Sequence, residues 1–269
     1  MSDYFVREPE APAVPLLVSI PHTGTDVPDD IAARFASPGV AALPDTDWHL
    51  HRLYDFVPRL GARTLYARFS RYVADLNRPA DGSLLYPGRP ETALVPAATF
   101  AGEPIYATGD EPGAAEIAQR IERFWKPYHE RLERELAALR ERFGYALLFD
   151  AHSIASEVPR LVPGRLPHLM LGDADGRSAA PELSLAVLAV HAKSGLEHRR
   201  NDPFKGGFIT RAYGRPEGHV HALQLEMSQR SYMIEGAPFA FGEALAAALR
   251  PTLTATLRAL VDAARRLYG

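Results

Sequence analysis

Cysteine is absent from this sequence of 269 residues. Its absence excludes disulfide bonds and thiolate metal sites, so any zinc ion must be held by histidine and carboxylate side chains. A chain without thiols also fits a reducing compartment. Residues 1–14 are polar and proline-rich and lack the apolar region of a signal peptide. We therefore expect a cytoplasmic protein.

Long apolar runs and a strong net charge are missing as well. No run approaches the ~20 residues that span a bilayer, and the formal net charge is −3. We therefore expect neither a membrane nor a nucleic acid as partner. The sequence has no Gly-x-Ser-x-Gly elbow, P-loop, dinucleotide fingerprint or His-Glu-x-x-His motif. These absences argue against serine hydrolases, nucleotide enzymes and one group of zinc proteases.

Short apolar runs are present, and three of them end in residues that can bind a metal or move a proton. Residues 16–20 lead to His22, residues 146–149 lead to the segment Asp150-Ala151-His152, and residues 222–225 lead to Glu226. Such runs are typical of buried strands in an α/β sheet. Ligands of open α/β sheets gather outside the carboxyl ends of the strands, so these side chains are candidates for one site.

The rest of the pattern predicts a single domain over residues 1–269, with strands that alternate with helices and a mainly parallel sheet. The longest helical pattern covers residues 114–143, and Pro127 should kink it. The other expected elements are helices over 29–36, 48–60, 181–196 and 237–268, strand pieces over 64–67 and 72–74, an irregular segment over 79–113 and a β-like segment over 201–213.

A metal site is the hypothesis that best joins the three strand ends. Catalytic zinc commonly takes two histidines, one carboxylate and water, and His22 and His152 supply the imidazoles. The third ligand must come from elsewhere, and Asp45 and Asp47 are the candidates, with Asp47 preferred. His49 and His51 lie close by and compete for the role. Taken singly, each of these residues has a structural alternative, such as a helix cap or a core histidine.

Two acids near these ligands have other expected roles. Asp150 lies two residues before His152, so both side chains should project from the same face of a strand, and Asp150 could then orient the imidazole. Glu226 follows an apolar strand, where a carboxylate is costly unless it is paired, liganded or catalytic.

Two polar segments are candidates for binding an anionic substrate. Arg71, Asn77 and Arg78 could hold a carboxylate through charged and amide hydrogen bonds, although a solvated turn is the alternative. Lys205 and Arg211 flank two glycines that would let the backbone approach a ligand; a simple hairpin turn is the other interpretation of this segment.

Taken together, these motifs resemble the N-formylglutamate amidohydrolase family, over roughly residues 15–235. The segments that carry the resemblance are 19–24, Asp45-Thr46-Asp47-Trp48, 70–78, 150–153, 201–207 and 225–227. The resemblance implies a three-layer α/β/α fold with a central mixed, mainly parallel sheet, similar to that of zinc carboxypeptidases and aspartoacylases.

The resemblance also implies roles for individual residues. His22, an early acid and His152 would bind Zn²⁺ or another divalent metal, Asn77 and Arg78 would bind a substrate carboxylate, and Glu226 would be the catalytic base. One departure concerns the metal. Those similar enzymes often place an acid three residues after the first histidine, where this chain has Thr25, so the third ligand must come from another segment, and Asp47 is preferred.

The implied activity is hydrolysis of N-formyl-L-glutamate to formate and L-glutamate, as in histidine degradation, with a small N-acyl amino acid as the substrate. The alternatives are an aspartoacylase-like or desuccinylase-like hydrolase and a non-catalytic module that binds a metal or an amino acid. The sequence leaves the acyl group, the metal and the oligomeric state open.

Overall fold

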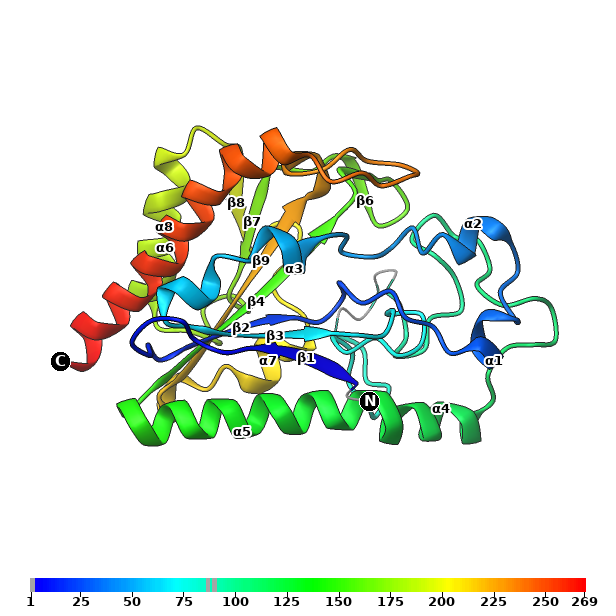
Figure 1. Ribbon diagram of the computed structural model, residues 1–269, viewed down its shortest axis with the longest axis horizontal. Helices are drawn as coiled ribbons and strands as arrows, with labels where there is room; N and C mark the ends of the chain where they lie inside the picture. Colours follow the sequence, from blue (N-terminus) through cyan, green and yellow to red (C-terminus); the bar gives the residue numbers. More distant parts are fainter. Residues whose placement is uncertain (1–2, 86–87, 89–90) are drawn as a thin grey trace.

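A seven-stranded sheet runs through the middle of the computed structural model, which describes residues 3–85, 88 and 91–269 (Figure 1). The strands lie in the order β1 (Tyr4–Arg7), β3 (Arg63–Ala67), β2 (Leu16–Ile20), β4 (Ala146–Ile154), β9 (Val220–Ser228), β7 (Leu169–Gly172) and β8 (His198–Arg200). Only the pairs β1–β3 and β7–β9 are antiparallel. The prediction of a mixed, mainly parallel sheet is confirmed.

Helices cover both faces of this sheet, as Figure 1 shows with α5 below it and α6 and α8 above. The face below carries α5 (Lys126–Phe143) and α7 (Phe208–Tyr213), and the other carries α3 (Leu50–Leu53), α6 (Pro181–Lys193) and α8 (Glu243–Tyr268). Successive side chains of β4 point to opposite faces of the sheet, so both faces are apolar and both bind helices. Leu147 and Phe149 pack on the side of α6 and α8, and Leu148 packs on the side of α5. The predicted α/β/α architecture is therefore confirmed.

The remaining elements are short. They are α1 (Asp29–Ala32), α2 (Pro38–Ala41), η1 (Val57–Leu60), α4 (Ala114–Arg120), the π-helical turn η2 (Ile121–Trp125), β5 (Glu157–Val158), β6 (Val162–Arg165), η3 (Pro216–Gly218) and η4 (Gln229–Ser231). No helix among the described residues is both long and apolar enough to cross a membrane.

The long helix over residues 114–143 is present but interrupted as expected near its proline. It runs as α4, η2 and α5, with Pro127 in the first turn of α5. Proline has no N–H to donate to the preceding turn, and the wider π-helical turn lies directly before it. The irregular segment over residues 79–113 contains no helix among its described residues, and residues 86–87 and 89–90 lie outside them.

Several sequence-based predictions of local structure are wrong. Residues 72–74 form a turn instead of a strand, because the Ser70 backbone and side chain accept hydrogen bonds from the next residues. The segment expected to be β-like contains the helix α7, whose Ile209 packs against the sheet. The segment 48–60 divides into α3 and η1. The strand β1 lies in an N-terminal region that showed no alternation of apolar and polar residues.

Candidate metal centre and active site

Three parallel strands deliver their polar residues to one edge of the sheet. In the register, His152 of β4 lies opposite Glu226 of β9, and Asp150 lies opposite Gln224. His22 follows the end of β2, the other neighbour of β4. The even-numbered residues of β4 and β9 at this edge point to the face covered by α5 and α7, because their odd-numbered neighbours pack into the core on the other side. The expectation that these strand ends meet is confirmed.

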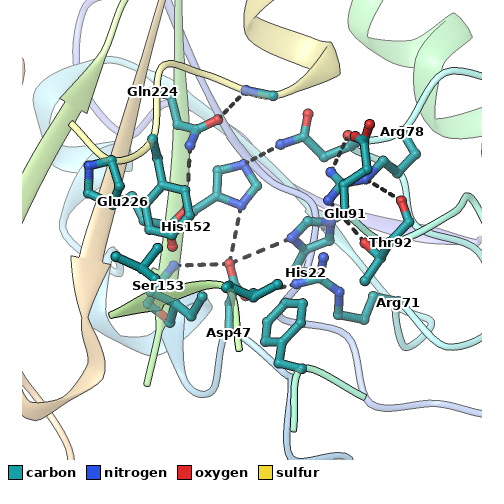
Figure 2. Close-up of a pocket in the computed structure, with 18 residues that line it drawn as sticks. His22, Asp47, Arg71, Arg78, Glu91, Thr92, His152, Ser153, Gln224 and Glu226 are labelled. Atoms are coloured by element: carbon teal, nitrogen blue, oxygen red, sulfur yellow. Dashed lines mark hydrogen bonds and ion pairs between the residues drawn. The ribbon is translucent and has the colours of Figure 1, made fainter. Parts of the chain in front are cut away.

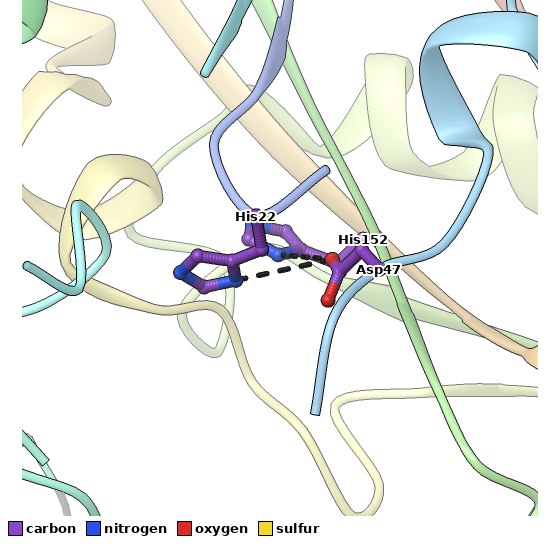
Figure 3. Close-up of side chains that lie close together, drawn as sticks. All are labelled: His22, Asp47 and His152. Carbon is purple, nitrogen blue, oxygen red and sulfur yellow. Dashed lines mark ion pairs between the residues drawn. The ribbon is translucent and has the colours of Figure 1, made fainter. Parts of the chain in front are cut away.

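His22, Asp47 and His152 come together at this edge and can each offer one ligand atom, all within 4.8 Å of one another. The Oδ2 atom of Asp47 lies 3.3 Å from Nδ1 of His152 and 3.8 Å from Nδ1 of His22. Figure 3 shows the two rings converging on this carboxylate. All three side chains are buried. The sequence-predicted trio is therefore a compact group of two imidazoles and one acid.

Two further carboxylates are hydrogen-bonded to the Nε2 atoms of the imidazoles, the nitrogens that face away from Asp47. His22 Nε2 lies 2.8 Å from Oδ1 of Asp75, and His152 Nε2 lies 2.8 Å from Oδ2 of Asp150. Each carboxylate favours the tautomer that carries hydrogen on Nε2, and this tautomer leaves the lone pair of Nδ1 facing Asp47. Histidines that bind metals are usually held in this way.

Asp47 has one oxygen without a hydrogen-bond partner. Its Oδ2 accepts a hydrogen bond from the backbone N–H of Ser153 at 3.0 Å, whereas its buried Oδ1 accepts none from the described residues. The nearest charged group is Arg71, whose Nη1 lies 3.9 Å from Oδ1. A buried, unsatisfied carboxylate oxygen is costly, and the donor set of two imidazoles and one acid suits zinc. The residues present therefore fit a divalent metal.

The competing candidates for the third ligand are engaged elsewhere. The Asp45 carboxylate accepts hydrogen bonds from the Tyr72 hydroxyl and the Phe100 backbone, each at 2.8 Å. His49 contacts the carbonyl of Phe239, and His51 contacts the hydroxyl of Thr23. The preference for Asp47 over Asp45 thus agrees with the geometry.

The acids around the centre have contrasting proton affinities. Burial raises the pKa of Glu226 to about 8. Burial alone would also raise the pKa of Asp75, but the charges of Arg71, His22 and Arg78 together hold the pKa of that carboxyl well below its usual range. Burial alone would lower the pKa of His152, yet Asp150 and Asp47 raise it well above its usual value. Neighbouring acids with separated pKa values are typical of catalytic sites.

A cavity opens beside the candidate metal ligands His22, Asp47 and His152, and Figure 2 shows the side chains that line it. Glu226 reaches it from β9, with Nε2 of Gln224 at 3.4 Å from Oε2 of Glu226. The polar lining residues are His22, Asp47, Arg71, Asn77, Arg78, Glu91, Thr92, His152, Ser153, Gln224 and Glu226. The apolar lining residues include Phe100, Leu161 and Phe204.

The comparison with known proteins agrees with this geometry. Residues 14–233 match the N-formylglutamate amidohydrolase family. The chain belongs to this family. It is 48% identical to an N-formylglutamate deformylase of Pseudomonas aeruginosa over 95% of its own length and 96% of that protein. It is 46% identical to an N-formylglutamate deformylase of Pseudomonas putida, with 92% of each chain covered.

A crystal structure from the same family has the same fold. The N-formylglutamate amidohydrolase of Ralstonia eutropha superposes with a TM-score of 0.85 at 29% identity, and 99% of both chains is covered. The family resemblance drawn from the motifs is confirmed, and with it the expected class of enzyme, an amidohydrolase.

Within this amidohydrolase fold, the four predicted substrate-binding residues lie in different places. Arg71, Asn77 and Arg78 line the cavity. Arg211 is not among the lining residues, and its Nε and Nη1 donate to the backbone carbonyls of Gly206 and Leu85. Three of the four predicted substrate-binding residues therefore lie in the same cavity as the candidate metal ligands.

Several residues of the site were not singled out from the sequence. The Asp75 carboxylate is hydrogen-bonded to the His22 ring. In the sequence, its only distinguishing feature is its position between two apolar residues, which are buried, just before Asn77. Gln224 could have been found from its i, i+2 relation to Glu226, which places both side chains on one face of β9. The cavity residues Glu91, Thr92 and Phe100 lie in the irregular segment, where no helix or strand period predicts which way a side chain points.

Proposed function

We propose that this chain catalyses the metal-dependent hydrolysis of N-formyl-L-glutamate to formate and L-glutamate. The observation that carries the proposal is the meeting of His22, Asp47 and His152 with Glu226 at one cavity. The two Pseudomonas relatives, which share nearly half of their residues with this chain, bear the name of this activity. The expected cytoplasmic location belongs to the proposal, and so does a role in histidine degradation, which follows from the family resemblance.

His22, Asp47 and His152 would hold the metal, with zinc as the first choice and another divalent ion as the alternative. When bound, zinc supplies Lewis-acid chemistry that lowers the pKa of water and polarises a carbonyl group. Asp75 and Asp150 keep the two imidazoles in the required tautomer and orientation. The unsatisfied oxygen of Asp47 supports this assignment.

Glu226 is the proposed acid and base. Its pKa of about 8, raised by burial, lies close to neutral pH, where a carboxyl group can both take and return a proton. Glu226 accepts a proton from the water that attacks the formyl carbon, and it then delivers that proton to the amine nitrogen as the C–N bond breaks. The Arg71 guanidinium, which donates to Asp75 at 2.6 Å, is the proposed donor that stabilises the developing negative oxygen.

Arg78 and Asn77 are the proposed binding groups for a substrate carboxylate. Arg78 donates from Nε and Nη2 to the carbonyl and hydroxyl of Thr92 and from Nη1 to the carbonyl of Asn77. These three bonds fix the guanidinium, and two of its five N–H groups remain for a ligand. Arg211 lies outside the cavity lining, and its predicted role in binding would therefore require a second carboxylate that reaches beyond the cavity.

The test is a product-release assay with the N-formyl, N-acetyl and N-succinyl forms of glutamate and aspartate, with and without a chelator. We expect turnover of N-formyl-L-glutamate that is lost with the chelator and restored by zinc. Turnover of only N-acetyl-aspartate or N-succinyl-glutamate would replace the proposed substrate. Unchanged turnover after exhaustive chelation would refute the metal dependence.

A further inference from the structure

Two side chains of one helix hold the backbone on both sides of Asn77. Trp125, the last residue of η2, donates from Nε1 to the carbonyl of Arg78 at 2.9 Å. His129, one turn later in α5, has Nε2 at 2.8 Å from the carbonyl of Leu76. The residues before and after Asn77 are thus each tied to the same helix.

The rings of this pair are themselves fixed. Trp125 and His129 stack with their centroids 3.7 Å apart, and Phe208 of α7 packs against both. The hydroxyl of Tyr213 lies 2.9 Å from Nδ1 of His129. Burial lowers the pKa of His129 to about 3, so the ring is neutral near pH 7. A neutral ring that accepts from Tyr213 at Nδ1 must carry its hydrogen on Nε2, where it can donate to Leu76.

The helix departs from regular geometry at this point. The π-helical turn Ile121–Trp125 ends at Trp125. A π-helical turn contains one extra residue, which rotates the helix after the turn by about 100° relative to the helix before it. The turn therefore determines which face of the helix meets the Leu76–Arg78 segment. Single π-helical turns are often found at functional positions.

Asn77 gains a third support from α7. The backbone N–H of Ile209 donates to Oδ1 of Asn77 at 2.8 Å. The aromatic contacts of Phe208 join α7 to Trp125 and His129. The two helices therefore enclose the segment that carries Asn77 and Arg78.

We propose that Trp125 and His129 are positioning residues that fix Asn77 and Arg78 for binding the substrate carboxylate. This inference rests on the proposed function. A purely structural pair would contribute to folding alone. A positioning pair has a further consequence: loss of either donor loosens the cavity edge that binds the carboxylate and leaves Glu226 and the metal-binding trio in place.

The test compares Trp125→Phe and His129→Leu, which remove the donors, with His129→Gln, which keeps an N–H close to the position of Nε2. One lost hydrogen bond of about 1 kcal/mol corresponds to roughly a fivefold change. We expect KM for N-formyl-L-glutamate to rise about fivefold in the first two variants, with kcat within about twofold of the unmodified chain and full metal content. His129→Gln should recover most of the KM.

Hydrogen exchange of the Asn77 and Arg78 amides is the second measurement, and it needs no substrate. Exchange should be faster in Trp125→Phe and His129→Leu than in the unmodified chain and in His129→Gln. Unchanged KM and exchange in folded Trp125→Phe would overturn the inference, as would a His129→Gln variant as impaired as His129→Leu. If the unmodified chain does not hydrolyse N-formyl-L-glutamate, the proposed function fails, and exchange alone then decides the positioning role.

Discussion

The Nε2 atom of His22 lies 2.8 Å from Oδ1 of Asp75, and both side chains are buried. Asp75 also accepts a hydrogen bond from Arg71 Nη2 at 2.6 Å and one from the backbone of Asn77 at 2.9 Å. A single carboxylate therefore orients a proposed metal ligand, a proposed oxyanion donor and the segment that carries the proposed carboxylate-binding residues.

Asp75→Asn should weaken metal binding. The amide cannot accept as strongly from His22 and no longer balances the charge of Arg71, and loss of such a partner typically lowers metal affinity by about 10–100-fold. Competition with a chromophoric chelator measures the affinity. Asp26→Asn is the control, because that exposed carboxylate pairs only with Arg68 at the surface among the contacts described. Full affinity in Asp75→Asn would contradict the role of Asp75.

Glu226→Gln should retain the metal and lose turnover. Glutamine keeps the size of the side chain and its contact with Gln224, but it cannot take a proton from water or return one to the amine. General acid–base catalysis contributes roughly 100- to 10,000-fold, so kcat should fall by at least about 100-fold. Elemental analysis should find unchanged metal content. Near-normal turnover would remove Glu226 from the role of base.

Much of this site could be predicted because strand geometry carries over from the sequence. The alternation along a strand places Asp150 and His152 on one face, and parallel neighbours bring their ends together. His22 and Glu226 are found by the same reasoning, since each follows an apolar run. The long helix was equally accessible through its apolar stripe and the position of Pro127.

The rest could not be predicted because it depends on how loops return to the sheet. Asp45 and Asp47 lie two residues apart, and only the folded chain shows that one turns to Tyr72 and the other to the histidines. Asp75 was hidden because residues 72–74 resemble a strand and form a turn. The edge strand β1 has no alternating pattern, so its pairing with β3 depends on tertiary contacts.

Gly207→Ala should displace Asn77. A Cβ atom at Gly207 would lie 2.2 Å from Nδ2 and 2.6 Å from Oδ1 of Asn77, far inside contact distance. Overpacking of this kind costs about 1–3 kcal/mol, and we expect a lower free energy of unfolding together with a raised KM. Gly218→Ala is the control, since its Cβ would meet only Arg215 at 4.0 Å. Equal KM values in the two variants would show that Asn77 does not bind substrate.

His191→Leu should stabilise the fold, most strongly in mild acid. His191 is fully buried in α6, and neither ring nitrogen has a hydrogen-bond partner among the described residues. Burial lowers its pKa to about 4, whereas the unfolded chain binds the proton near pH 6.5. Between these values the unfolded state holds more protons, so this residue makes stability fall as the pH drops from about 6.5 towards 4.

Replacement by leucine removes both the unsatisfied nitrogens and this pH dependence. We expect the free energy of unfolding in urea to rise by about 1 kcal/mol at pH 7.5 and by more at pH 5.5, since an unsatisfied buried polar group costs roughly 1–3 kcal/mol. His221→Leu is the matched comparison, because its buried ring contacts the Tyr268 hydroxyl and accepts from the Ala180 backbone. That variant should be destabilised at pH 7.5, and a destabilised His191→Leu would show that the His191 ring has a partner after all.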